Sequence, residues 1–194
     1  MTEILPPYIL KRNARSRTVR VSVSAGGKVK VSAPRWTTEA TIKKFLLDHA
    51  AWLRQKVEHF KKFPQRNKLT LTQEKKLYIL HKAKAKTVAE AKVKQWNEQF
   101  KFVFSRISIR KSRTRWGSCS SKGTLCFNYK IAFLPEHLAD YLVVHELCHL
   151  REKNHGKGFW SLVAGSIPQY ASHRKELRNF EISFKSETDD IIRV

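Results

Sequence analysis

The sequence predicts an α+β fold in which a β-hairpin and several helices precede a small antiparallel sheet and a long apolar helix. Apolar and polar residues alternate with the period of a strand over residues 18–32. Apolar residues recur with helical spacing over residues 38–62 and again over 136–152. Hydrophobic residues make up 41% of the 194 residues, which is enough to form a packed core and excludes a wholly disordered chain.

The first expected elements are a hairpin and a helix. Two alternating stretches, 18–23 and 28–32, surround a glycine-containing turn and therefore predict a β-hairpin. Apolar spacing then predicts a helix over 38–62, with Thr37 or Thr38 as its capping residue.

The remaining elements follow in the order of helices, strands and helices. Further helices are expected at 72–84, 87–100, 136–152, from about 155, and at 169–181. Thr87 and Glu90 would form a capping box at the start of the second of these. Strand-like segments stand at 102–104, 107–109 and 124–128. We expect a single domain over 1–182, with a hairpin–helix part at about 8–63, a helical part at about 70–100, a core at about 101–182, and a frayed tail at 183–194.

Basic residues are concentrated in the first half of the chain. The formal net charge is +23, and residues 1–100 carry 23 Lys and Arg against 7 Asp and Glu. Such a charge predicts a phosphate-bearing partner, a nucleic acid or a nucleotide, although a solvated basic surface has the same composition. The candidates for this surface are ten lysines: Lys61, Lys62, Lys68, Lys75, Lys76, Lys82, Lys84, Lys86, Lys92 and Lys94.

The cysteines and the N-terminal sequence predict a cytoplasmic protein. Cys119, Cys126 and Cys148 form no disulfide framework, and the first residues lack the pattern of a signal peptide. No apolar run approaches the about 18 residues of a membrane span, so we expect no membrane association. The sequence specifies no oligomeric state.

The helix predicted at 136–152 carries an H-E-x-x-H motif formed by His145, Glu146 and His149. Two histidines four residues apart lie on one face of a helix, where both imidazoles can bind a single Zn²⁺. Glu146 is placed to accept a proton from metal-bound water. The alternative is a surface helix with two solvent-facing histidines. It is disfavoured because the neighbouring residues are apolar, and polar residues on a buried helix are costly unless they are paired or bind a metal.

A catalytic zinc site needs a third protein ligand and leaves a fourth position for water. His155 is the favoured third ligand, because Asn154 and Gly156 suit a short turn that would return the chain to the metal. The competing candidates lie in the last predicted helix: His173, Glu176 and Glu181.

Several further residues accompany this motif: Arg115-Trp116-Gly117-Ser118-Cys119-Ser120, Asn128, Pro135, Asn154-His155-Gly156, Phe159-Trp160 and the earlier Ala33-Pro34-Arg35. Together with the HELCHL segment they resemble the YgjP-like metallopeptidase family, whose core is related to the SprT-like zincins. The resemblance covers about residues 8–182. It implies a zincin-like catalytic core, with His145, His149 and His155 as metal ligands and Glu146 as the catalytic residue.

We therefore expect a zinc-dependent metallohydrolase, most directly a metallopeptidase that cleaves a peptide or protein with zinc-bound water and Glu146 as general base. A first alternative keeps the metal but hydrolyses nucleotides or other phosphate-bearing substrates. A second is a basic protein associated with nucleic acid, with a protease site or a structural zinc site. Arg115 is a candidate for binding an anionic substrate, with a structural salt bridge as the alternative.

Overall fold

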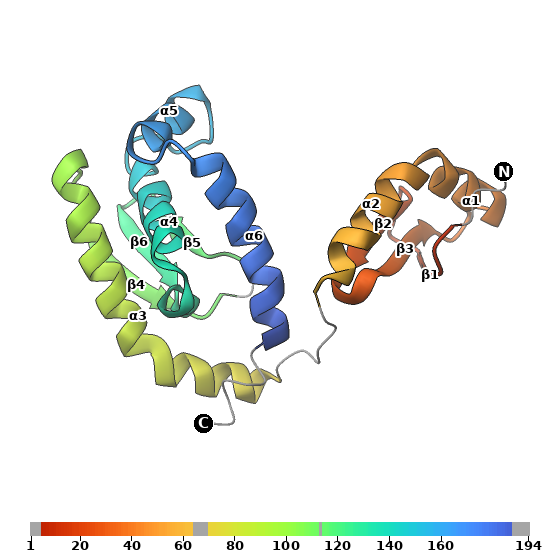
Figure 1. Ribbon diagram of the computed structural model, residues 1–194, viewed down its shortest axis with the longest axis horizontal. Coiled ribbons are helices and arrows are strands. Elements are labelled where there is room, and N and C mark those ends of the chain that lie inside the picture. Colours follow the sequence, from red (N-terminus) through yellow and green to blue (C-terminus); the bar gives the residue numbers. More distant parts are fainter. Residues whose placement is uncertain (1–4, 64–69, 113, 188–194) are drawn as a thin grey trace. The chain divides into compact units, whose positions relative to one another are not determined.

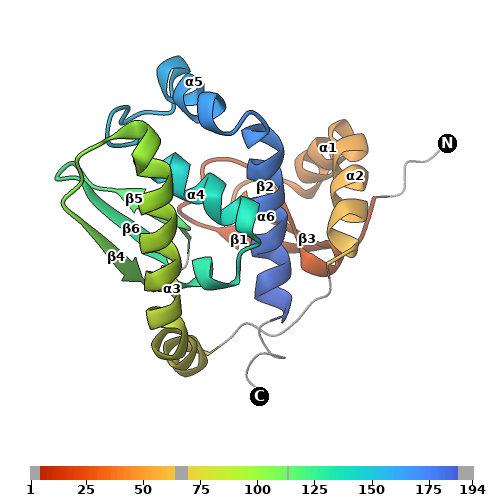
Figure 2. The same cartoon turned by 60° about the vertical axis from the view of Figure 1, so that its left-hand side comes forward.

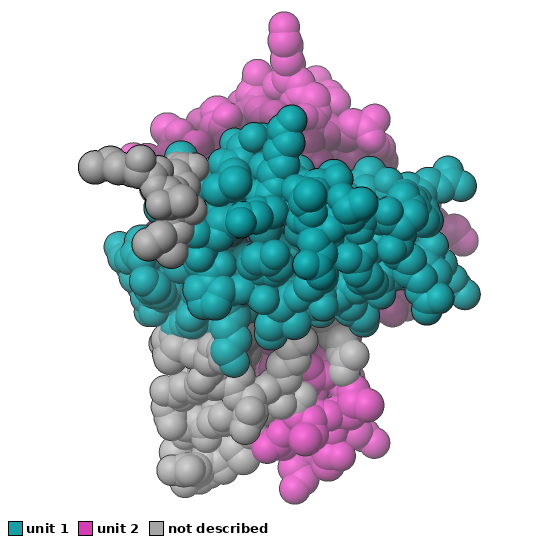
Figure 3. Space-filling view, turned by 90° about the vertical axis from the view of Figure 1, so that its right-hand side faces the viewer, with its two compact units in different colours: residues 1–68, 182–191 teal, residues 69–181, 192–194 magenta. Residues whose placement is uncertain are grey.

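The computed structural model describes residues 5–63, 70–112 and 114–187, with side chains up to residue 182. Internal contacts divide the chain into two compact units, which are coloured separately in Figure 3. Unit 1 contains residues 1–68 and unit 2 contains residues 69–181, while the end of the last helix is grouped with unit 1. The expectation of a single domain over 1–182 stays a prediction.

Unit 1 is built on a three-stranded sheet of order β1-β3-β2 (Figure 1). The antiparallel strands β2 (Arg20–Ser24) and β3 (Lys28–Pro34) confirm the predicted hairpin. Their turn contains Gly26 and Gly27 at φ values of 75° and 70°, a left-handed conformation that favours glycine. Strand β1 (Tyr8–Asn13) pairs in parallel with β3. It was not predicted, because five of its six residues are exposed and it lacks the alternation of a half-buried strand.

Two helices cover one face of this sheet, where a single helix over 38–62 was predicted. Helix α1 (Glu39–Asp48) and helix α2 (Ala50–Lys61) are separated at His49, whose backbone φ and ψ are −115° and 17°. The His49 ring nitrogen Nδ1 lies 2.8 Å from the carbonyl oxygen of Phe45. The side chain of Thr38 accepts a hydrogen bond from the backbone N–H of Thr41, so Thr38 caps α1. Apolar side chains of both helices and β3 form the core: Val29, Val31, Ala33, Ile42, Leu46, Leu53 and Val57.

Unit 2 begins with helix α3 (Leu71–Phe100), which replaces the two shorter helices predicted there. The capping box lies at its start, where Thr70 and Gln73 bond each other's backbone N–H groups. The hydroxyl of Thr87 instead donates to the carbonyl of Ala83 within the helix. The chain stays helical through this point because Ala85 and Ala89 are fully buried, so packing stabilises the central turns.

The sheet of unit 2 has the order β4-β6-β5 and is mixed. Strand β5 (Gly117–Cys119) is antiparallel to β6 (Thr124–Asn128), whereas β4 (Arg106–Arg110) is parallel to β6. The prediction of an antiparallel sheet was therefore wrong for β4. The predicted strand at 102–104 is irregular, because both backbone polar groups of Phe102 bond the side chain of Asn97.

Helix α4 (Glu136–Cys148) lies at the centre of unit 2, with α3 and α6 on either side and α5 at one end (Figures 1 and 2). Helix α5 comprises Lys157–Ser166 and helix α6 comprises Tyr170–Glu187. Residues 183–187 of the predicted tail are thus helical, and 188–194 lie outside the described residues. None of the described helices is both long and apolar enough to cross a membrane.

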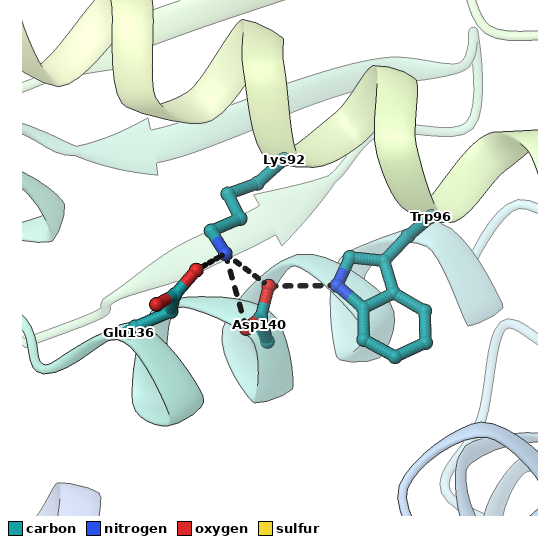
Figure 4. A network of polar contacts seen from close by, with 4 residues as sticks. All are labelled: Lys92, Trp96, Glu136 and Asp140. Carbon is teal, nitrogen blue, oxygen red and sulfur yellow. Dashed lines mark hydrogen bonds and ion pairs between the residues drawn. The ribbon is translucent and has the colours of Figure 1, made fainter.

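A polar network fixes α3 against the first turns of α4 (Figure 4). The Lys92 Nζ atom lies 2.6 Å from Glu136 Oε1 and 2.9 Å from Asp140 Oδ1. The indole N–H of Trp96 donates to the same Asp140 carboxylate at 2.8 Å. Lys92 is only 14% exposed, so this contact orients the helix that carries the H-E-x-x-H motif and removes one lysine from the proposed basic surface.

Candidate metal centre

Helix α4 presents two of the predicted metal ligands on one side. His145 and His149 are one turn apart, and their ring centroids are separated by 5.0 Å. Nine of the thirteen residues of α4 are buried, Glu146 among them. The helix is therefore a core element rather than a surface helix, and both histidines remain partly accessible at one end of it.

The turn after α4 brings His155 to the same place. Its Nε2 atom lies 3.1 Å from Nε2 of His145, and one ring nitrogen from each of the three histidines falls within 4.8 Å of the others. The competing ligands are not part of this cluster. Glu176 instead lies 3.0 Å from Nε2 of His137, and the ring of His173 packs against those of His137 and Tyr141.

A hydrogen bond selects the tautomer of His149. Its Nδ1 lies 3.0 Å from the carbonyl oxygen of Glu152. A carbonyl can only accept, so Nδ1 carries the proton and the lone pair on Nε2 remains free for a metal. The carbonyl belongs to the turn that precedes His155, and the same contact therefore holds the turn in place.

The ring of Phe159 packs against all three imidazoles. It is fully buried on α5, and its ring centroid lies 4.9 Å from His145, 4.5 Å from His149 and 4.7 Å from His155. Trp160 stacks on His155 at 5.6 Å. The sequence alone assigned neither aromatic residue a role at the site, and the available signal was their position four and five residues after His155.

Glu146 is a carboxylate in an apolar setting. It is 4% exposed, and burial raises its pKa to about 8, while the charge of Arg115 acts in the opposite direction. Its Oε2 atom has no hydrogen-bond partner among the described residues. A buried carboxyl without a partner is costly and is typical of functional sites.

Strand β5 packs directly on this carboxylate. A Cβ atom at Gly117 would lie 2.7 Å from both Cγ and Cδ of Glu146, closer than carbon atoms can approach, and still closer to Oε1. Glycine is thus required here for a close approach rather than for a positive φ. Asn128 donates to the carbonyls of Ser112 and Arg115 and so fixes the chain that leads into β5.

Arg174 on α6 is a further residue that the sequence reasoning missed. Its guanidinium carbon lies 5.1 Å from the centroid of the Trp160 ring, which in turn stacks on His155. Burial lowers the pKa of His145 to about 3, with contributions from His149, His155 and Arg174. Burial and the charges of His149 and Arg174 likewise lower the pKa of His155. Both imidazoles are therefore neutral at pH 7, the form that binds metals.

The three histidines fit a zinc ion. Two nitrogens bound tetrahedrally at about 2.0–2.1 Å would lie about 3.3 Å apart, close to the 3.1 Å between His145 and His155. No fourth His, Cys, Asp or Glu joins the trio within residues 5–63, 70–112 and 114–182.

The other residues singled out in the sequence lie in the core, form ion pairs or fall outside the described residues. Cys148 is fully buried and burial raises its pKa to about 12, so it behaves as a core residue. Trp116 packs 6.1 Å from Phe180. Lys61 pairs with Glu58, and Lys86 with Glu90, and Lys68 lies outside the described residues.

Comparison with known proteins identifies the family. The family model of the YgjP-like metallopeptidase domain matches residues 17–80 and 64–180. The UTP pyrophosphatase of Escherichia coli (strain K12) is 37% identical over 59 residues, a match that covers 30% of this chain and about a third of that protein (35%).

A solved structure is also similar. The crystal structure of the metallopeptidase zymogen of Pyrococcus abyssi abylysin aligns with a TM-score of 0.44 and 20% identity, over 47% of this chain and 92% of that one. The family match spans most of the described chain, including the three histidines and Glu146. The chain therefore belongs to the YgjP-like metallopeptidase-domain family.

Proposed function

We propose that the chain is a zinc-dependent metallopeptidase in which His145, His149 and His155 bind the metal and Glu146 is the general base. The observation that carries this proposal is the trio of imidazoles beside one buried carboxylate, without a fourth protein ligand among the described residues. Three protein ligands leave a position open, which is the arrangement of catalytic zinc sites rather than structural ones.

Glu146 performs the proton transfers in this proposal. His145, His149 and His155 would hold a Zn²⁺ ion, which would supply polarisation of the scissile carbonyl and a lowered pKa of a water molecule. Oε2 of Glu146 is unpaired among the described residues and accepts the proton of the attacking water, and the same atom then passes it to the leaving amine. A cation held by the three histidines would lower the pKa of Glu146, because the carboxylate would gain an opposite charge nearby.

Strand β5 supports a peptide as the substrate. It is an edge strand of the sheet and lies against Glu146 through Gly117. An edge strand offers unpaired backbone N–H and C=O groups, to which an extended peptide can add as a further strand. A peptide bound in this way would pass beside the carboxylate of Glu146.

A second candidate is hydrolysis of a nucleoside triphosphate at a phosphoanhydride bond. The similarity to a UTP pyrophosphatase over 59 residues favours it, as do two arginines whose charges act on the site. Arg115 acts on Glu146, and Arg174 acts on His145 and His155. Guanidinium groups bind phosphate oxygens bidentately, so the pair would hold a triphosphate at the same metal.

One set of assays separates the two candidates. Purified protein is analysed for metal and then incubated in parallel with casein, a mixed peptide library, and UTP, CTP and ATP. We expect about one zinc per chain, and turnover of one substrate class that falls at least about 10²-fold in Glu146→Gln. Peptide cleavage supports the peptidase, and pyrophosphate release supports the second candidate. Activity that persists unchanged in Glu146→Gln contradicts both.

A further inference from the structure

One face of the unit 1 sheet packs against α1 and α2, and most of the described side chains of its other face are exposed. Strand residues alternate between faces, and Val29, Val31 and Ala33 of β3 are buried against α1 and α2. Lys28 and Lys30 therefore point to the opposite face, and both are exposed.

Strand pairing places two more cations on the same face. In the β2–β3 register, Arg20 lies opposite Ser32, Ser22 opposite Lys30, and Ser24 opposite Lys28. In the β1–β3 register, Ile9 lies opposite Lys30 and Lys11 opposite Ser32. Paired residues share a face of the sheet. We call this set the outer sheet face: Ile9, Lys11, Arg20, Ser22, Ser24, Lys28, Lys30 and Ser32.

The charge on the outer sheet face is not compensated. Residues 5–38 contain eight Lys and Arg and no Asp or Glu, and the acidic residues of 39–63 stand on the helices. None of the four outer-face cations forms an ion pair with another described residue. Lys92 and Lys86 of α3 differ in this respect, since both pair with carboxylates. The serines between the cations are short, so the longer ammonium and guanidinium groups extend beyond them.

An exposed aromatic residue stands where this face ends. Trp36 follows β3 and is 68% exposed. The guanidinium of Arg12 donates to the carbonyls of Pro34, Arg35 and Thr37, and these bonds fix the turn that carries Trp36. A basic groove or face that tracks phosphates, next to an aromatic ring on which a base can stack, is how proteins bind single-stranded nucleic acid without sequence preference.

We infer that the outer sheet face of unit 1, with Trp36 at its end, binds the sugar-phosphate backbone of a single-stranded nucleic acid. Lys11, Arg20, Lys28 and Lys30 contact phosphates, and the indole of Trp36 stacks on one base. An anionic membrane is the less favoured partner, because interfacial binding depends on buried apolar area and Ile9 is the only apolar member of the defined face. This function is independent of the hydrolytic site.

Two variants of equal charge test the inference. The outer-face variant carries Lys11→Gln, Arg20→Gln, Lys28→Gln and Lys30→Gln. The control variant carries Lys43→Gln, Lys44→Gln, Lys56→Gln and Lys62→Gln, on or directly after the helices of the same unit. Both lower the net charge by four, and thermal melts confirm that both are folded. Binding of a fluorescent 20-nucleotide single strand is measured by anisotropy between 50 and 200 mM salt.

We expect wild type and the control variant to bind the strand with a steep salt dependence. The outer-face variant should lose most binding, with the slope of log K against log salt reduced by about 3, since each single-strand phosphate contact contributes about 0.7. Trp36→Ala should weaken binding about tenfold or more. Glu146→Gln should bind like wild type, so a failure of the proposed hydrolase does not affect the result.

Three outcomes would overturn the inference. The first is equal loss of binding in the outer-face and control variants, which would mean that only overall charge matters. The second is binding of vesicles containing phosphatidylserine without binding of the single strand. The third is equal binding of single strand and duplex together with unchanged binding by Trp36→Ala. That outcome would show that no base stacks on Trp36.

Discussion

Glu146 makes the stability of the metal-free protein depend on pH, and Glu146→Gln removes that dependence. Burial raises the pKa of Glu146 from its ordinary 4.5 to about 8. The folded state therefore holds a proton that the unfolded state has released, and stability is lost as the pH rises toward 8. Each pH unit in this window is equivalent to about 1.4 kcal/mol.

Histidines act in the opposite direction at lower pH. The pKa values of His81, His145 and His155 are lowered from 6.5, mainly by burial. The unfolded state therefore binds protons more readily than the folded state below pH 6.5, and stability falls as the solution becomes more acidic. The metal-free protein should be most stable near pH 6.5. Between pH 6.5 and 8 it should lose about 2 kcal/mol through Glu146.

Urea denaturation in the presence of a chelator measures this directly. Free energies of unfolding are compared at pH 5.5, 6.5, 7.25 and 8 for wild type and Glu146→Gln, which has no titrating group at this position. We expect the difference between the two proteins to change by about 2 kcal/mol from pH 6.5 to 8. Parallel curves over that range would show that the Glu146 carboxyl is not held neutral, and the reasoning from its burial would be wrong.

Three further substitutions test the architecture of the site. Gly117→Ala should displace the Glu146 side chain and lower kcat about 10²-fold with near-normal melting, whereas Gly165→Ala, which has open space around it, should keep full activity. Arg174→Met should raise the KM for an anionic substrate about 10- to 100-fold, and an equal effect of the control Arg178→Met would refute a specific role. Asp140→Asn should lower the free energy of unfolding by about 1–3 kcal/mol in urea titrations, because the nearly buried Lys92 ammonium loses its contact with the Asp140 carboxylate. An unchanged denaturation midpoint would contradict this.

Local patterns predicted the elements whose residues determine their own structure. The hairpin of β2 and β3, the cap at Thr38 and the helix with the H-E-x-x-H motif all depend on residues close together in sequence. The gathering of His155 with His145 and His149 also followed from a short turn.

The elements that were wrong or missed depend on distant residues. Strand β1 is mostly exposed and is recognisable only through its pairing with β3. The continuity of α3 depends on the burial of Ala85 and Ala89 by other elements. Gly117 and Arg174 reach the site from β5 and α6, and no spacing in the sequence predicts that these elements meet at α4.

Phe159 would connect a metal ion at the three histidines to the folding of α5. The ring touches all three imidazoles, and His155 stands in the turn immediately before this helix. An ion that binds the three histidines would therefore also stabilise the packing of residues 150–166, because it binds only when this segment is in place. Loss of the ion should expose this segment first, through local opening well below the cost of global unfolding. Amide hydrogen exchange in α5 would then report metal occupancy, and proteolysis there would selectively remove chains that have lost it.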